Sequence, residues 1–175
     1  MDSLSTPHFS NIILIGMAGA GKSTVGALLA RRCGRTFVDT DALIETRCGC
    51  SLQAYLERAG TDGLRKIEEE VLLSLEADEL VIATGGSAIY SERGMAHLSQ
   101  TGVVVLLAAR LSTVMARIEN QETRGLVNPD GTDFASLYHA RQPLYARWAD
   151  WSLAVDHDPP GDIADKILAR IVHSR

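Results

Sequence analysis

The sequence of 175 residues has little that would direct it to nucleic acid or to a membrane. It contains 17 Lys and Arg against 22 Asp and Glu, a formal net charge of −5, whereas nucleic-acid-binding proteins usually carry clustered basic residues. No apolar run approaches the roughly 20 residues of a membrane-spanning helix. The opening "MDSLSTPHFS" lacks the basic-then-apolar order of a secretory signal. We therefore expect a cytoplasmic protein that binds neither nucleic acid nor membranes.

Cysteine is also scarce: the chain has three, Cys33, Cys48 and Cys50. Small secreted proteins pair many cysteines in disulfides, so a set of three favours reduced thiols and the cytoplasm. The Cys-Gly-Cys run does not make a metal site, because no further cysteine or nearby histidine completes a set of ligands. No linker, repeat or low-complexity segment divides the chain. We expect residues 1–175 to form a single domain.

Apolar runs with strand character alternate with helical patterns along the whole chain. The runs are continuous, which is typical of strands buried on both faces of a parallel sheet. Expected strands span residues 11–16, 36–40, 80–85, 103–108 and 152–156, and expected helices span 22–33, 41–49, 61–77, 91–99, 112–120, 134–149 and 161–173. Ser91 and Ser112 are expected N-caps. The pattern predicts a three-layer α/β fold, with a five-stranded parallel sheet flanked by helices.

Two intervals do not fit simple crossovers between strands. Residues 41–79 are long enough for two or three helices. Residues 120–133, "NQETRGLVNPDGTD", are polar and rich in turn residues, with Arg124 near their start. Such a segment fits a lid that closes over a site, and it fits an ordinary exposed loop equally well.

The stretch "GMAGAGKST", between the first expected strand and the first expected helix, matches a phosphate-loop pattern. Gly16-x-x-x-x-Gly21-Lys22-Ser23 has the spacing G-x-x-x-x-G-K-[ST]. Glycines let backbone amides wrap phosphates, and the helix that follows presents its positive end. Lys22 would reach the β and γ phosphates, and the Ser23 hydroxyl would bind magnesium. We name residues 16–23 the phosphate loop and expect it to bind a nucleotide.

Polar and glycine residues follow the second and third expected strands. "DTDALIE" carries Asp39 and Asp41, which would share a face on an extended segment. Ligands of α/β sheets gather beyond the carboxyl ends of strands, so one acid could serve a magnesium shell and the other a substrate hydroxyl. Alternatively, Asp41 caps the next helix. In "ATGGSA", Gly85 and Gly86 would admit a ligand close to the backbone or simply make a tight turn.

Three arginines complete the candidate site. Arg65, Arg124 and Arg141 occur in "GLRKIEEE", in the lid candidate and in "HARQPLYARW". Arginine binds carboxylate or phosphate through two hydrogen bonds, although each of these residues taken singly also fits an exposed surface position. Glu68, three residues after Arg65, could hold it in place on one helical face.

In the order of these landmarks the sequence resembles the shikimate kinases over nearly its whole length. The order is "GMAGAGKST", "FVDTDALIE", "LRKIEEE", "ATGGSA", an arginine in a lid, and "RQPLY". The resemblance implies one P-loop NTPase-type kinase domain, with a substrate-binding helical region at about 41–79 and a lid at about 120–133. It implies transfer of the γ-phosphoryl group of ATP to the 3-hydroxyl of shikimate, with Mg²⁺, in a monomer of aromatic amino-acid biosynthesis.

The same resemblance assigns residue roles. Asp41 would bind the substrate hydroxyls and accept a proton, Arg65 and Arg141 would hold the carboxylate, and Gly85 and Gly86 would line the substrate site. Arg117 would stack on adenine, Arg124 would close over the phosphates and act in catalysis with Lys22 and Asp41, and Asp39 would bind magnesium through water beside Ser23. The nucleotide would contact Gly19, Ala20, Gly21, Lys22, Ser23 and Thr24.

Four departures distinguish this chain from the family pattern. Ser87 replaces a third glycine, Gly125 replaces a proline after the lid arginine, and Leu64 replaces a phenylalanine before Arg65. An arginine usual near the end of the last strand is missing from "VDHDPPGD". A kinase of another hydroxy acid, such as gluconate, and a nucleotide-binding regulator without transfer activity remain alternative functions.

Overall fold

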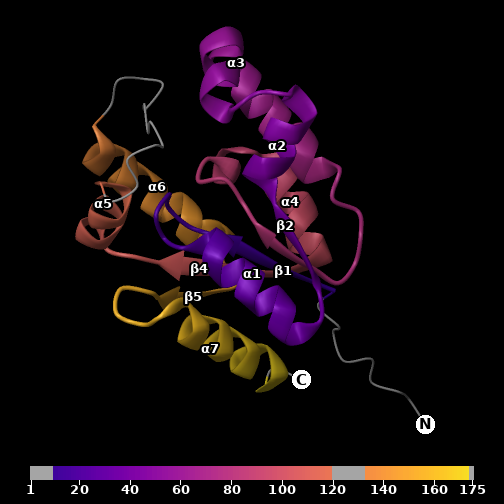
Figure 1. The fold of residues 1–175 in the computed structure, drawn as a ribbon, viewed down its shortest axis with the longest axis vertical. Helices are drawn as coiled ribbons and strands as arrows, with labels where there is room; N and C mark the ends of the chain where they lie inside the picture. Colours follow the sequence, from indigo (N-terminus) through magenta and orange to yellow (C-terminus); the bar gives the residue numbers. More distant parts are fainter. Residues whose placement is uncertain (1–9, 120–132, 174–175) are drawn as a thin grey trace.

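The computed structural model describes residues 10–119 and 133–173 (Figure 1). Strands and helices alternate from its start. The strands are β1 (Asn11–Ile15), β2 (Thr36–Asp39), β3 (Leu80–Ala83), β4 (Gly102–Ala108) and β5 (Trp151–Ala154). The helices are α1 (Lys22–Cys33), α2 (Thr40–Cys48), α3 (Leu52–Leu73), α4 (Glu92–Thr101), α5 (Leu111–Glu119), α6 (Phe134–Trp148) and α7 (Pro160–His173), with a short 3₁₀ helix η1 (Ala88–Tyr90).

The five strands of the described residues form one parallel sheet in the order β2-β3-β1-β4-β5. Ile13 at its centre pairs with Ile82 on one side and Val104 on the other. Because the strands are parallel, the loops after β1, β2 and β3 leave the same edge of the sheet. The predicted α/β fold with a five-stranded parallel sheet is confirmed.

Burial along the strands follows their place in the sheet. Every residue of β1 and β3 is buried, as continuous apolar runs predict. The edge strands differ: β5 alternates between half-buried and exposed residues, and β2 begins with an exposed threonine. The expectation of strands buried on both faces is therefore right for the centre of the sheet and wrong for its edges.

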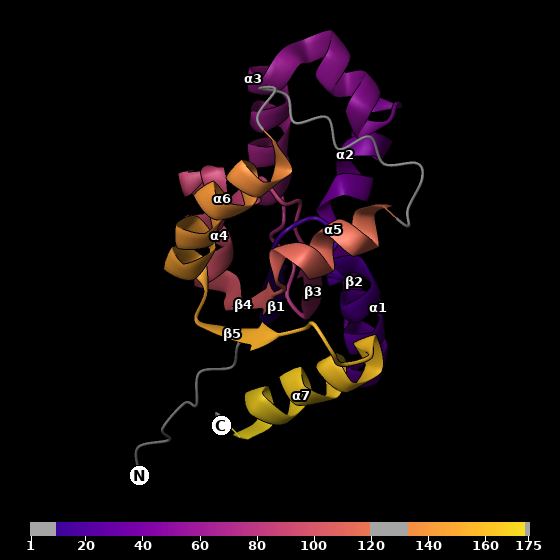
Figure 2. The same ribbon diagram turned by 90° about the vertical axis from the view of Figure 1, so that its left-hand side faces the viewer.

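The helices cover the two faces of the sheet in separate layers. Figure 2 shows α1 and α7 on one face and α4 and α6 on the other, with α2 and much of α3 extending beyond the sheet. α3 starts at Leu52, where the Ser51 hydroxyl caps it, and has a non-helical kink at Gly60 (φ 70°). The helix predicted at 61–77 therefore starts where the second part of α3 does, directly after the kink, but the structure ends it at Leu73. None of the described helices combines the length and apolarity needed to cross a membrane.

The two predicted serine caps have different outcomes. The Ser91 hydroxyl accepts a hydrogen bond from the Gly94 amide (3.0 Å) and caps α4, as expected. The Ser112 cap is wrong, because α5 begins at Leu111. The carboxylate of Asp156, beyond β5, accepts the Arg110 amide at that end instead (2.8 Å). The lid candidate at 120–132, with Arg124 and Gly125, lies outside the described residues.

Candidate functional site

The phosphate loop leaves β1 in a conformation that only glycine accommodates easily. Gly16 has φ 145°, and a Cβ there would lie 2.7 Å from the Leu107 carbonyl oxygen. Gly21 has φ 96° and occupies the N-cap of α1, with no side chain covering the amides of that helix end. These amides, together with the positive end of α1, form a site suited to an anion.

Lys22 lies inside the loop and is buried (8% exposed). Its ammonium group donates hydrogen bonds to the carbonyl oxygens of Gly16 (2.7 Å) and Met17 (2.9 Å). A buried ammonium needs such partners, because desolvation without them is costly. The loop therefore holds a positive charge at its centre.

Ser23 and Asp39 are joined where the phosphate loop meets the end of β2. The Ser23 hydroxyl donates to Asp39 Oδ2 (2.6 Å), while Oδ1 accepts the amides of Asp41 (3.0 Å) and Ala42 (3.3 Å). Asp39 is thus the N-cap of α2, and the alternative of an Asp41 cap is wrong. A hydroxyl beside a carboxylate is an oxygen set that suits Mg²⁺, which prefers one or two carboxylates together with substrate phosphates.

Asp41 lies in the first turn of α2, so the expected extended segment for Asp39 and Asp41 is not observed. It nevertheless faces the end of β3: a Cβ on Gly85 would lie 2.6 Å from Asp41 Oδ1. The Gly85 amide donates to the hydroxyl of Thr40 (2.9 Å). The two strand ends are therefore tied together, with the Asp41 carboxylate against a residue that has no side chain.

Gly86 lies between the phosphate loop and α6. A Cβ there would lie 3.1 Å from Arg141 Nη1 and 3.5 Å from the Ala18 amide nitrogen. Its carbonyl oxygen accepts a hydrogen bond from the buried hydroxyl of Tyr145 (2.7 Å). Within the described residues the buried Nε of Arg141 has no hydrogen-bond partner, which leaves a donor for a bound anion.

Glu68 on α3 is a buried acid at the centre of this cluster, and Ser87 is a partner of Glu68 that sequence reasoning did not name beside Arg65. It accepts a hydrogen bond from Ser87 and is only 9% exposed. Burial and the neighbouring Asp41 charge raise its pKa to about 7, although the Ser87 hydrogen bond and the charges of Arg141 and Arg65 act in the opposite direction. The departure at Ser87 thus supplies a hydrogen bond to this acid.

Arg65 and Arg141 come from different helices but meet at one aromatic ring. The Cζ atoms of Arg65 and Arg141 lie 5.3 Å and 5.5 Å from the ring centroid of Tyr90. The predicted pair of arginines is therefore brought together by α3, α6 and η1. Sequence reasoning missed Tyr90, because only the fold places the end of η1 between these helices.

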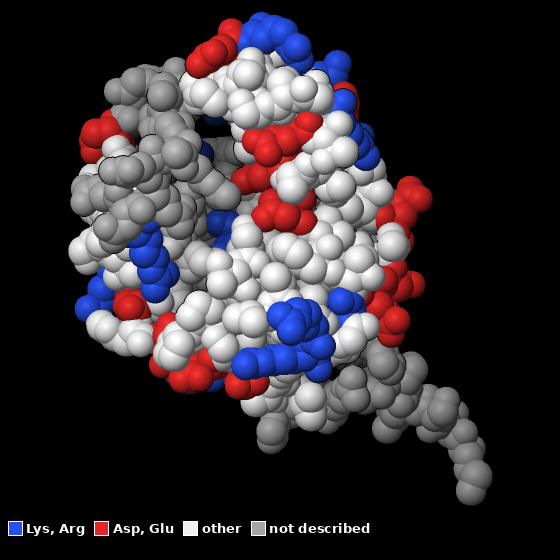
Figure 3. Space-filling model, viewed as in Figure 1, with Lys and Arg blue, Asp and Glu red and all other residues white. Residues whose placement is uncertain are grey.

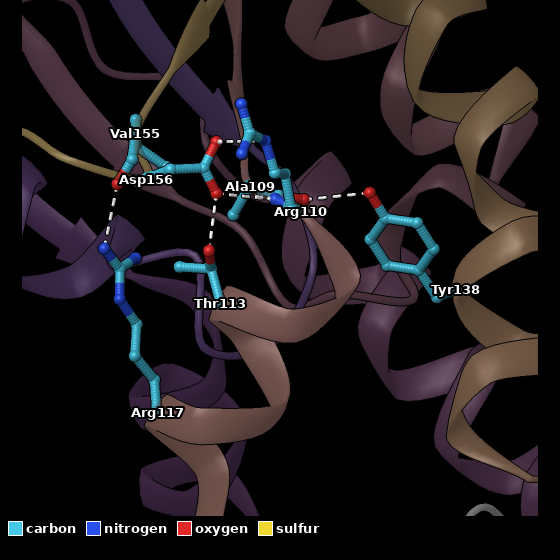
Figure 4. Close-up of polar contacts among 7 residues, drawn as sticks. All are labelled: Ala109, Arg110, Thr113, Arg117, Tyr138, Val155 and Asp156. Atoms are coloured by element: carbon cyan, nitrogen blue, oxygen red, sulfur yellow. Dashed lines mark hydrogen bonds and ion pairs between the residues drawn. The ribbon is translucent and has the colours of Figure 1, made fainter.

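Arg117 on α5 borders the phosphate loop from the side of β5 (Figure 4). It donates to the carbonyl oxygens of Gly19 (3.3 Å), Ala20 (3.4 Å) and Val155 (2.8 Å). The predicted nucleotide residues Gly19, Ala20 and Gly21 thus lie together with Arg117, and Thr24 follows in the first turn of α1, exposed.

Asp156, in the stretch that lacks the expected arginine, binds α5 instead. Its carboxylate accepts hydrogen bonds from the Arg110 amide (2.8 Å) and the Thr113 hydroxyl (2.6 Å), and it forms an ion pair with Arg110 (3.8 Å) (Figure 4). The Thr113 and Arg110 hydrogen bonds hold the pKa of Asp156 below its usual value. This contact fixes the helix that carries Arg117.

A hollow marks the site on the molecular surface. The space-filling view shows it beside α2 and α3, with acidic side chains along that rim and basic side chains inside (Figure 3). Among the described residues no group of three or more His, Cys, Asp or Glu lies together as a metal site. An oxygen-bound magnesium shared with phosphates remains the metal that the residues fit.

The parallel sheet, the phosphate loop and the acid and arginine groups next to it define a P-loop kinase of small molecules. A sequence model described as shikimate kinase matches residues 18–172. A shikimate kinase of Geobacter sulfurreducens is 40% identical over 158 residues, covering 88% of this chain and 86% of that protein. The chain belongs to the shikimate kinase family.

Solved structures agree with this assignment. A shikimate kinase from Acinetobacter baumannii in complex with shikimate superposes with a TM-score of 0.88 at 34% identity, covering 95% of this chain and 94% of that chain. A gluconokinase from Sinorhizobium meliloti is 18% identical, with a TM-score of 0.58 and coverage of 94% and 92%. The second likeness shows the shared fold alone.

Proposed function

We propose that this protein transfers the γ-phosphoryl group of ATP to the 3-hydroxyl of shikimate, giving shikimate 3-phosphate and ADP in aromatic amino-acid biosynthesis. The observation that carries the proposal is the position of Gly86, where a Cβ would lie 3.5 Å from the Ala18 amide nitrogen and 3.1 Å from Arg141 Nη1. Phosphate-binding and carboxylate-binding groups thereby flank one small space. Membership of the shikimate kinase family supports the choice of acceptor.

On the nucleotide side, the phosphate loop would bind the phosphates through its amides and through Lys22. Lys22 already lies in the loop, where it would exchange carbonyl partners for phosphate oxygens. The flat Arg117 guanidinium, which donates to the Gly19 and Ala20 carbonyl oxygens, would stack on adenine. The contacted backbone would extend from Gly19 through Thr24.

Magnesium fits the oxygens of Ser23 and Asp39, 2.6 Å apart. Ser23 would bind the ion directly and Asp39 through water, since Mg²⁺ keeps several waters in such sites. When bound, the ion would neutralise charge that develops on the phosphates.

On the acceptor side, Arg65 and Arg141 would hold the carboxylate of shikimate. Asp41, against Gly85, would accept hydrogen bonds from the hydroxyls, and the Gly86 backbone would line the space next to them. In the reaction the 3-hydroxyl oxygen attacks the γ-phosphorus, its proton passes to Asp41, and the bond to the β-phosphate oxygen breaks to release ADP. The protein acts by positioning and by stabilising charge.

Arg124 and the segment at about 120–133 would complete the site as a lid, within one domain of residues 1–175. Asp133, at the end of this segment, caps α6 by accepting the Ser136 amide (3.0 Å). An arginine that closes over the phosphates would stabilise charge during transfer. Limited proteolysis tests this: ATP with acceptor should suppress cleavage within 120–132, and equal cleavage in both states would exclude the lid.

The experiment that tests the proposed function is a coupled assay of ADP release with shikimate, with gluconate and with no acceptor. Release should depend on shikimate. ADP release that depends on gluconate alone would support a kinase with a different acceptor. Release that depends on neither acceptor would favour a regulatory protein that only binds nucleotide. Asp41 argues against the regulatory alternative, because a protein that only binds nucleotide needs no carboxylate on the acceptor side.

We further propose a cytoplasmic monomer that needs neither nucleic acid nor membrane. Cys33, Cys48 and Cys50 form no disulfide, which agrees with a reducing compartment. Light scattering during size-exclusion chromatography tests the monomer against an expected mass of 18.9 kDa.

A further inference from the structure

Tyr90 lies at the end of η1 and contacts both arginines that we assign to the acceptor carboxylate. The Cζ atoms of Arg65 and Arg141 are 5.3 Å and 5.5 Å from its ring centroid. The side chain is 37% exposed and contributes little to the core. Its position therefore calls for an explanation other than packing.

The backbone around Tyr90 is attached to both helices that carry the arginines. On one side, the Ser91 hydroxyl donates to Glu69 Oε2 on α3 (2.7 Å). On the other side, the indole nitrogen of Trp148 on α6 donates to the Ile89 carbonyl oxygen (3.2 Å). The ring is thus held at a set distance from Arg65 and from Arg141.

An aromatic ring in this position has a clear physical effect on two cations. Guanidinium groups that approach each other repel, and their long side chains lose conformational freedom when they are fixed. The negative face of an aromatic ring attracts each cation, and a tyrosine ring is itself rigid. Tyr90 would therefore favour the conformation in which both guanidiniums point to one anion before that anion arrives.

We infer that Tyr90 is a positioning residue of the acceptor site, which holds Arg65 and Arg141 ready for the carboxylate of the substrate. The inference rests on the proposed function and adds to it a residue that touches neither ATP nor the transferred phosphoryl group. It predicts that Tyr90 affects recognition of the acceptor's negative charge and leaves the nucleotide side unchanged.

The test compares Tyr90→Leu with Tyr90→Phe. The leucine variant should raise KM for shikimate about tenfold, the size of two lost cation–ring contacts at a partly exposed site. KM for ATP should stay within twofold of wild type, and phenylalanine, which keeps the ring, should restore KM for shikimate. Arg170→Met, which removes another arginine from an aromatic ring (Trp151, 4.5 Å), should change neither constant.

A second substrate separates action through the arginines from direct contact with the acceptor. The methyl ester of shikimate keeps the ring and hydroxyls but has no negative charge. Tyr90→Leu should lower kcat/KM about tenfold for shikimate and less than twofold for the ester. Tyr90→Gln, which also removes the aromatic ring, is measured in parallel. If Tyr90→Leu is destabilised, the glutamine variant still tests the role of the ring.

The outcomes are distinct. An equal loss for shikimate and ester means that the ring contacts the acceptor or supports the fold in general, and this overturns the inference. Unchanged kinetics in the leucine and glutamine variants also overturn it, while the proposed function survives. If wild type does not phosphorylate shikimate, the proposed function fails and the inference fails with it.

Discussion

The phosphate loop and the acceptor side of the site meet at Gly86, but different parts of the chain build them. The loop is one short stretch, residues 16–23, in which the backbone amides at the start of α1 and the buried Lys22 would bind phosphates under the proposed function. On the acceptor side, charged side chains come from α2, α3 and α6. One side is local in sequence, and the other exists only after the helices have packed.

This difference extends to the carboxylates of the two sides. Asp156, which fixes α5 beside the phosphate loop, has two donors, and they lower its pKa. Glu68, on the acceptor side, is buried beside Asp41, and its pKa rises to about 7. The hydrogen bonds to Asp156 favour its charged form, whereas burial and a neighbouring negative charge disfavour the charged form of Glu68.

The largest expected effect concerns the loop side. Lys22→Ala should reduce turnover on the order of 10³-fold, because a fixed positive charge at the phosphates is lost. It should also lower stability by about 1–3 kcal/mol, since two buried carbonyls lose their donor. Steady-state kinetics and chemical denaturation measure the two effects. Lys166→Ala, which removes a surface ion pair with Asp158, is the control, and normal turnover in Lys22→Ala would contradict the loop assignment.

Glu68→Gln should remove a pH dependence of stability that wild type owes to this buried acid on the acceptor side. The folded pKa of about 7 lies above the ordinary value of 4.5, so wild type has its full stability from this group below pH 4.5 and loses it as the pH rises through 7. The loss should be about 3 kcal/mol relative to Glu68→Gln, which stays neutral. Urea denaturation from pH 4.5 to 8 measures it. A constant difference between the two proteins would contradict the burial of this charge.

Asp41→Asn tests whether the acceptor side takes part in chemistry as well as binding. The amide keeps the size of the side chain but cannot accept the hydroxyl proton, so kcat should fall about 10²-fold. Initial rates over a range of shikimate concentrations separate kcat from KM. A rise in KM with unchanged kcat would make Asp41 a binding residue only.

Arg141→Leu should affect the acceptor side of the site and leave the nucleotide side unchanged, which a comparison of KM for shikimate with KM for ATP would show. Losing a charge-assisted hydrogen bond from a buried anion costs about 2–3 kcal/mol, which corresponds to about a 30- to 150-fold rise in KM for shikimate. KM for ATP should remain nearly constant, because Arg141 faces Gly86 from the acceptor side. Equal increases in both constants would show that the two sides are not independent.

The smallest expected effect is at Asp156, which supports the loop side from a distance. Asp156→Ala should lower stability by about 1 kcal/mol near neutral pH, because the Arg110 amide and the Thr113 hydroxyl at the start of α5 lose their acceptor. The folded pKa is lowered, so the contribution of Asp156 is present above pH 3.8 and is lost as the pH falls below it. Thermal denaturation at pH 7 and pH 3 measures the change. A loss that is equal at both values would show that the charge is not responsible.

Much of the fold could be predicted because its signals are local. The buried strands at the centre of the sheet are continuous apolar runs, and the phosphate loop has a fixed spacing of glycine, lysine and serine. Ser91 was identified as a cap because its partner amide is three residues away. The part of α3 before Gly60 was expected only as one of two or three helices in 41–79 and received no bounds, since glycine at position 60 and the polar residues around it weaken the helical pattern.

The sequence by itself determined the sheet, the phosphate loop and the family to which the chain belongs, because each depends on residues that are near one another along the chain. Tertiary structure decided the contacts between elements: on the acceptor side the hydrogen bond of Ser87 to Glu68 and the contact of Tyr90 with two arginines, and beside the phosphate loop the hydrogen bonds of α5 to Asp156. These contacts join residues from separate elements, and their strength depends on burial and distance. Neither quantity exists until the helices have packed against the sheet.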